Sequence, residues 1–159
     1  MPVVAILGPR QSGKTTLAKN VFAEYLYLSL ENPDVHARAQ ADPKRFLTLP
    51  SGVPGIIIDE VQRIPALLSY IQGIVDEKQR AGQYILTGSQ NFLLSQAISQ
   101  TLAGRIAIHT LLPLSIAELQ EAHQLPTSET VTVFNGFYPR IYDQQLSPTS
   151  NTPCAFFVS

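Results

Sequence analysis

Cysteine is almost absent from this chain of 159 residues. Cys154 is the only one, so the chain forms no intramolecular disulfide and no metal site built on several cysteines. No apolar run approaches the roughly 20 residues of a membrane helix, and the N-terminus enters an apolar segment without a basic stretch ahead of it. We therefore expect a cytoplasmic protein with no membrane span and no secretion signal.

Charge is also scarce. Charged residues make up 14% of the chain, compared with roughly 25% in typical soluble domains. The net charge is −1, and no cluster of Lys and Arg is interleaved with aromatic residues, so direct nucleic-acid binding has no support. Two interpretations of the low charge remain open. Either the surface is largely neutral and polar, or part of it is covered by a partner or a missing segment.

The stretch GPRQSGKTT carries the strongest chemical signal. It fits G-x-x-x-x-G-K-[ST], with the apolar segment 3–7 before it and the start of a helix after it. The two glycines permit backbone angles closed to other residues, so the intervening amides can surround phosphate groups at the positive end of the helix. The competing interpretation is an ordinary glycine-rich turn. The predicted phosphate-binding residues are Gly8, Pro9, Arg10, Gln11, Ser12, Gly13, Lys14, Thr15 and Thr16.

Two of these residues have further predicted roles. Lys14 would reach the β- and γ-phosphates of ATP and stabilise charge on the transferring phosphoryl group. The Thr15 hydroxyl would bind Mg²⁺.

A second motif is the apolar segment GIIIDE at 55–60. A strand that ends in adjacent carboxylates resembles the Walker B element. In that element Asp59 would hold Mg²⁺, usually through water, and Glu60 would polarise the attacking water. Solvated loop carboxylates are the alternative. The separation from the phosphate loop lies within the range of this fold and favours the catalytic interpretation.

Other candidate residues follow later strands. Thr87 or Ser89, at the end of segment 83–89, would hydrogen-bond the γ-phosphate or the water; the sequence does not separate the two, and a Ser/Thr/Gly turn is the alternative. Arg105 precedes an apolar segment and is either an arginine finger or sensor, or a surface or partner-binding arginine. The histidines show no metal-ligand spacing and are expected to be structural or exposed; they are His36, His109 and His123.

Hydrophobic patterning and turn residues predict the order of elements. Asn32 and Pro33 signal a helix start, and Ser115 with Glu118 forms a predicted capping box. The predicted strands cover 2–7, 25–30, 55–60, 83–89 and 104–109. The first predicted helix follows the phosphate loop and ends at about residue 24. The other predicted helices cover 32–40, 65–80 and 91–102.

The character of the chain changes after about residue 123. Residues 126–130 resemble a linker, 131–134 are short and β-prone, and 135–140 form a predicted turn. We therefore expect an ATPase domain at 1–123, with 124–159 as a linker and the truncated start of a C-terminal region.

With these segments in order, the chain resembles a family of bacterial and archaeal AAA-like P-loop ATPases, whose ATPase module is normally followed by a C-terminal domain of unknown function. The resemblance covers about residues 3–146 and runs through GPRQSGKTT, LSLENP, IIIDEVQRIP, ILTGSQNFLL, LAGRI, LLPLSIAEL and NGFYPR. It implies phosphate binding by residues 8–16, Mg²⁺ binding by Thr15 and Asp59, and a catalytic role for Glu60. It also implies a sensor at Thr87 or Ser89 and a charged contact from Arg105.

The chain departs from the family pattern in two places. Relatives usually have a helical stretch before the first strand, whereas this chain starts almost on it. The similarity stops near residues 147–149, and the chain ends in the apolar segment 156–158. We interpret the chain as a truncated or frame-shifted copy, and a continuation of the C-terminal domain in another frame of the downstream DNA would test this.

The expected fold is a three-layer α/β sandwich with a parallel five-stranded sheet; in such P-loop ATPases the strand order is 5-1-4-3-2. The leading function is Mg²⁺-dependent ATP binding and hydrolysis, with a homo-oligomer or a partner protein as a possible source of a further arginine. The second hypothesis is a nucleotide-dependent binding module with negligible turnover. A small-molecule kinase ranks last, because the region 92–104 contains no arginine for a lid.

Overall fold

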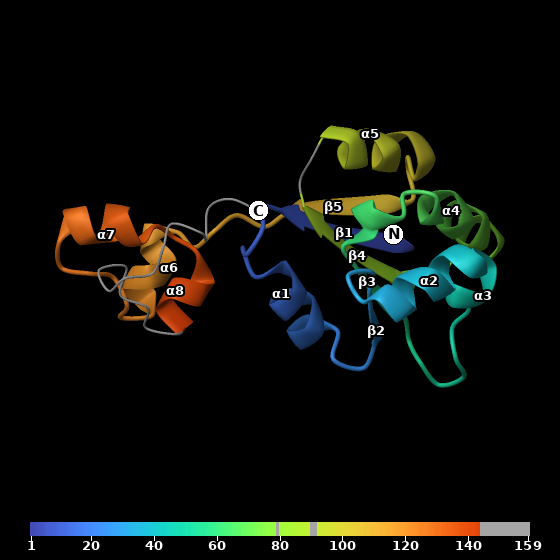
Figure 1. The fold of residues 1–159 in the computed structure, drawn as a ribbon, viewed down its shortest axis with the longest axis horizontal. Helices are drawn as coiled ribbons and strands as arrows, with labels where there is room; N and C mark the ends of the chain where they lie inside the picture. The colour runs from blue at the N-terminus through green and yellow to red at the C-terminus, as the bar shows by residue number, and fades with distance from the viewer. Residues whose placement is uncertain (79, 90–91, 144–159) are drawn as a thin grey trace. The chain divides into compact units, whose positions relative to one another are not determined.

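The computed structural model describes residues 1–78, 80–89 and 92–143, and the chain divides into two compact units between Leu111 and Leu112. No helix in the described ranges is long and apolar enough to cross a membrane. The first unit contains, in chain order, β1 (Val3–Gly8), α1 (Lys14–Val21), β2 (Leu26–Ser29), α2 (Pro33–Ala41), α3 (Pro43–Phe46), β3 (Ile56–Asp59), the 3₁₀ turn η1 (Val61–Arg63), α4 (Leu67–Lys78), β4 (Tyr84–Ser89), α5 (Phe92–Thr101) and β5 (Ile106–Thr110) (Figure 1).

The strands form one parallel sheet in the order β2-β3-β4-β1-β5. This is the predicted order 5-1-4-3-2 counted from the other edge, so the fold prediction is confirmed. The register pairs Gly8 with Ser89 and Ser29 with Asp59. The carboxyl ends of β1, β2, β3 and β4 therefore meet at one edge of the sheet, where doubly wound folds bind their ligands.

Apolar side chains cover both faces of the sheet, which explains why β1 and β3 are apolar almost throughout. On one face, Ile6, Ile57 and Ile85 pack with Ala18 of α1. The larger cluster on the other face combines the alternate strand residues with side chains from α2, α4 and α5. In Figure 1, α1 lies on one side of the sheet and α4 and α5 lie on the other. The three-layer arrangement is thus the one predicted.

Local caps fix several helix starts. The Asn32 side-chain oxygen accepts hydrogen bonds from the amides of Asp34 at 2.9 Å and Val35 at 3.4 Å, and Pro33 occupies the first helical position of α2. The predicted start of this helix is confirmed. In the second unit, Ser115 and Glu118 form the predicted capping box at the start of α6 (Ile116–Glu121).

The second unit continues with α7 (Glu129–Asn135) and α8 (Pro139–Asp143). The β-prone interpretation of 131–134 is wrong, because these residues lie within α7. The predicted turn 135–140 is shortened to 136–138 by the end of α7 and the start of α8. A single β-prone segment without a partner strand leaves its backbone groups unpaired, whereas a helix satisfies them locally. The apolar end at 156–158 and Cys154 lie outside the described residues.

Tyr84 anchors the large core cluster at the start of β4. Its side chain is fully buried, and its hydroxyl donates to the Leu47 carbonyl at 2.8 Å and accepts from Gln83 Nε2 at 3.2 Å. Burial raises the pKa of Tyr84 to about 12.

Replacing Tyr84 with phenylalanine is expected to lower the free energy of unfolding at neutral pH by about 1–3 kcal/mol, because the Leu47 carbonyl loses its donor. Since the folded pKa of Tyr84 lies above its unfolded value of 10.0, its contribution is complete below that value and is lost as pH rises through about 12. Urea unfolding of both proteins across this interval should give a shallower loss of stability for Tyr84→Phe. Identical pH slopes would contradict this.

Candidate functional site

Of the two glycines predicted to need special backbone angles in the loop between β1 and α1, only Gly13 has a positive φ, so this prediction is wrong for Gly8. Gly13, which immediately precedes α1, has φ 90° and ψ 9°, and Gln11 also lies in the left-handed region with φ 64°. Gly13 offers no side-chain cap to α1. The first amides of the helix are therefore available to an anion.

Lys14 is held inside this loop. Its ammonium donates to the Pro9 carbonyl at 2.6 Å, and the residue is only 5% exposed. Burial lowers the pKa of Lys14, and the nearby carboxylates of Glu60 and Asp59 oppose that shift. Ser12 is also buried, and its hydroxyl has no hydrogen-bond partner among the described residues. A buried cation and an unpaired hydroxyl in one loop fit the binding of a phosphate group.

The Asp59 carboxylate at the end of β3 accepts hydrogen bonds from four hydroxyl groups. Its Oδ1 accepts from Thr15 at 2.9 Å and from Thr87, and its Oδ2 accepts from Tyr27 at 2.7 Å and from Ser29 at 3.4 Å. Asp59 is only 5% exposed. The Thr15 hydroxyl and the Asp59 carboxylate together present the hard oxygen ligands that Mg²⁺ prefers.

Sequence reasoning missed Tyr27 and Ser29 as parts of this network. Burial and the hydrogen bond to Asp59 raise the pKa of Tyr27 to about 12, so the phenol stays protonated and remains a donor. The ammonium of Lys19 lies 3.7 Å from the centre of the Tyr27 ring. One signal was available: the two residues are two positions apart and therefore share a face of the predicted strand, and Ser29 ends it.

Glu60 directly follows β3 and has a left-handed backbone, with φ 59° and ψ 46°. Its Oε2 accepts a hydrogen bond from the side-chain amide of Gln62. Thr87 is fully buried on Asp59, while Ser89 ends β4 opposite Gly8. These residues lie at the same edge of the sheet as the phosphate loop.

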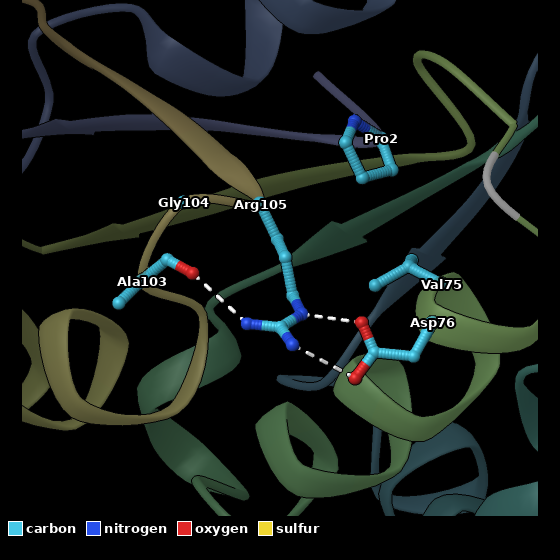
Figure 2. A pocket seen from close by; sticks show the side chains of 6 residues that line it. All are labelled: Pro2, Val75, Asp76, Ala103, Gly104 and Arg105. Atoms are coloured by element: carbon cyan, nitrogen blue, oxygen red, sulfur yellow. Dashed lines mark hydrogen bonds and ion pairs between the residues drawn. The ribbon is translucent and has the colours of Figure 1, made fainter.

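Arg105 lies at the other edge. Its carbonyl accepts from the Val3 amide at the start of β1, so the length of β1, roughly 16 Å at about 3.3 Å per residue, separates it from the loop. Figure 2 shows its guanidinium facing Asp76 of α4 in a surface pocket that Pro2 and Gly104 also line. Nε and Nη2 both donate to the Asp76 carboxylate, the latter at 3.0 Å.

This pair shifts both pKa values. The hydrogen bond from Arg105 lowers the pKa of Asp76, and the same bond raises the pKa of Arg105. The structure does not bring Arg105 to the phosphate loop of its own chain. Of the interpretations made from sequence, a sensor within one chain therefore does not fit the geometry, because parallel strands keep their two ends apart.

Metal-ligating side chains do not cluster elsewhere in the described parts of the chain: no group of three or more His, Cys, Asp or Glu residues is placed to hold an ion. His36 lies in α2, His109 in β5 and His123 after α6.

Comparison with known proteins identifies one family. A model of the AAA domain matches residues 1–120. Uncharacterized proteins of Mycobacterium bovis and Mycobacterium tuberculosis are each 39% identical over 121 residues, which is 74% of this chain and 26% of either relative. The chain thus spans about a quarter of the length of these relatives. A sugar kinase from Janibacter sp. HTCC2649 superposes with a TM-score of 0.40 at 15% identity, covering 94% of this chain and 81% of that one.

The start of the phosphate loop depends on the absence of a side chain at Gly8. A Cβ atom there would lie 2.0 Å from the Leu111 carbonyl oxygen. Gly8→Ala is therefore expected to cost about 1–3 kcal/mol of unfolding free energy. Gly73 in α4 has open space around it, so the control Gly73→Ala should stabilise by roughly 0.5–1 kcal/mol. Urea unfolding of both variants checks this, and an unchanged Gly8→Ala midpoint would refute it.

Proposed function

This chain belongs to the AAA domain family and is a nucleotide-binding P-loop NTPase, and we propose that it binds ATP with Mg²⁺ and hydrolyses it. The observation that carries the proposal is the Asp59 network, in which one buried carboxylate joins the loop residue Thr15 to Thr87 on the neighbouring strand. A purely structural turn needs no buried carboxylate at this point. A site that holds a cation beside phosphate groups needs such a carboxylate as a ligand.

The phosphate loop would bind the nucleotide through its amides and Lys14. The ammonium would exchange its contact with the Pro9 carbonyl for oxygens of the β- and γ-phosphates, where it stabilises charge that develops during transfer. The unpaired Ser12 hydroxyl would donate to the same anion. Thr15 and Asp59 would hold Mg²⁺, which when bound neutralises phosphate charge and orients the γ-phosphate.

Glu60 would orient the attacking water and accept its proton. Thr87 or Ser89 would hydrogen-bond the γ-phosphate or the attacking water and so act as the sensor. The hydroxyl of Thr87 already contacts the proposed metal ligand Asp59, so Thr87 would respond to the metal, whereas Ser89 lies beside the loop at Gly8.

A second candidate is a nucleotide-dependent binding module with negligible turnover, which the placement of Arg105 favours. Its guanidinium faces Asp76 at the opposite edge of the sheet, so Arg105 would not serve hydrolysis in its own chain, and an arginine from another copy or a partner protein would take that role. Such an arginine is worth about 10³–10⁵ in rate. We further propose an ATPase domain at 1–123, followed by the start of a C-terminal region at 124–159, and a cytoplasmic location.

Mg²⁺-dependent release of phosphate from ATP by the purified chain tests the function. We expect turnover that is abolished in Lys14→Ala, because phosphate binding is lost, and lowered about 10²–10⁴-fold in Glu60→Gln, because water is no longer activated. ATP binding that survives Glu60→Gln and is lost in Lys14→Ala, without turnover in the unmodified chain, would favour the binding module. ATP binding unaffected by Lys14→Ala would refute both proposals.

The metal site gives a separate prediction. Tyr27→Phe removes the donor to Asp59 Oδ2 but keeps the ring beside Lys19, so Mg²⁺ should bind the ATP complex about tenfold more weakly, as for other partners of metal ligands. ATP affinity without Mg²⁺ should not change. Ser29→Ala is the matched control, since its contact of 3.4 Å is long and its loss should matter less. A Mg²⁺ titration followed with a fluorescent ATP analogue measures these effects, and equal Mg²⁺ affinities in Tyr27→Phe and the unmodified chain would contradict them.

A further inference from the structure

Gln62 is carried on a fixed turn immediately after Glu60. The Arg63 amide donates to the Glu60 carbonyl at 3.0 Å, and the Ile64 amide donates to the Val61 carbonyl at 3.1 Å. Val61 is fully buried and Ile64 nearly so. Two apolar anchors therefore hold the backbone of η1 on either side of Gln62, and its side chain projects from a defined position.

The amide of Gln62 has two distinct ends. Its Nε2 donates to Glu60 Oε2, and since a carboxylate only accepts hydrogen bonds, this contact fixes which end of the amide faces Glu60. Its Oε1 is buried and has no partner among the described residues. An unpaired buried acceptor is costly and is retained only where something compensates for it.

Gly88 makes room for this amide on β4. A Cβ atom at Gly88 would lie 2.6 Å from Gln62 Oε1 and 2.9 Å from a methyl group of Leu94. Only glycine lets the amide lie against the strand at this point. Gly88 lies between Thr87 and Ser89 in the sequence, and the side chains of these two residues point to the other face of the strand.

We propose that Gln62 is a positioning residue for hydrolysis: its amide holds one oxygen of Glu60 and leaves the other to the attacking water, and Gly88 provides the space it occupies. The inference rests on the proposed ATPase function. It assigns no contact with the nucleotide to Gln62. Removing the amide should therefore change the rate of the chemical step and leave ATP binding unchanged.

The test compares Gln62→Met, which keeps the length of the side chain and removes the amide, with Gln100→Met, which alters an exposed glutamine on α5. We expect kcat to fall at least about tenfold in Gln62→Met, and by no more than the roughly 10²–10⁴-fold that a general base contributes. The affinity for ATP should not change, and Gln100→Met should behave as the unmodified chain. In a Glu60→Gln background, Gln62→Met should have little further effect, because the group that it positions is gone.

Gly88→Ala places a methyl group where the Gln62 amide lies and should displace that amide. This variant should therefore show the same fall in kcat as Gln62→Met, with ATP affinity retained. A second readout needs no turnover: Mg²⁺-ADP with aluminium fluoride, which mimics the transferring phosphoryl group, should bind Gln62→Met more weakly than the unmodified chain.

The outcomes separate this inference from the proposed function. An unchanged or raised kcat in Gln62→Met, or an additive loss in the Glu60→Gln background, overturns the role of Gln62 while leaving the ATPase proposal in place. If the unmodified chain does not hydrolyse ATP, the ATPase proposal fails. The role of Gln62 is then decided by the aluminium fluoride comparison alone. Weaker binding by Gln62→Met then supports the role, and equal binding, or none by either protein, overturns it.

Discussion

The buried carboxylate of Asp59 is the constraint on which the rest of this structure depends. A charge almost removed from solvent is costly unless hydrogen-bond donors surround it. The strand order supplies them, because β3 lies between β2 and β4 and each neighbour directs a hydroxyl at Asp59, from Tyr27 and from Thr87. Helix α1 adds the Thr15 hydroxyl across the same face. The order of the strands thus supplies the hydrogen-bond donors that the buried Asp59 carboxylate requires.

Lys14 is the positive counterpart of this arrangement. Burial lowers its pKa, and Glu60 and Asp59 counteract the shift, so the cation is kept in a partly dehydrated loop by carboxylates that also repel an incoming phosphate. A metal ion between Asp59 and the phosphate would reverse that repulsion. In the proposed site, coupling between nucleotide and metal binding would follow from the position of Asp59.

The parts of the fold and site predicted from sequence are those whose cause is local or repeated. The phosphate loop, the Asn32 cap and the Ser115 capping box each depend on a few adjacent residues, and the structure contains all three. The strand order came from the resemblance to a family. Tyr27 was missed because a contact between strands decides its role, and Gln62 because its place depends on the space at Gly88 of another strand. Helix α7 was missed because residues 131–134 pair with no strand among the described residues. No single segment carries that information.

Arg105 shows most clearly what strand register adds to a motif. Its place before an apolar segment suggested a phosphate contact, but pairing of β5 with β1 puts it at the far edge of the sheet from the loop. Its partner there, Asp76, has a side chain 47% exposed and that of Arg105 is 34% exposed, and such surface pairs contribute little to stability. The guanidinium also donates from Nη1 to the Ala103 carbonyl at 3.0 Å, so three hydrogen bonds hold it at this end of the sheet. Strand register therefore decides that Arg105 does not contact the phosphate loop of its own chain, which its place in the sequence could not show.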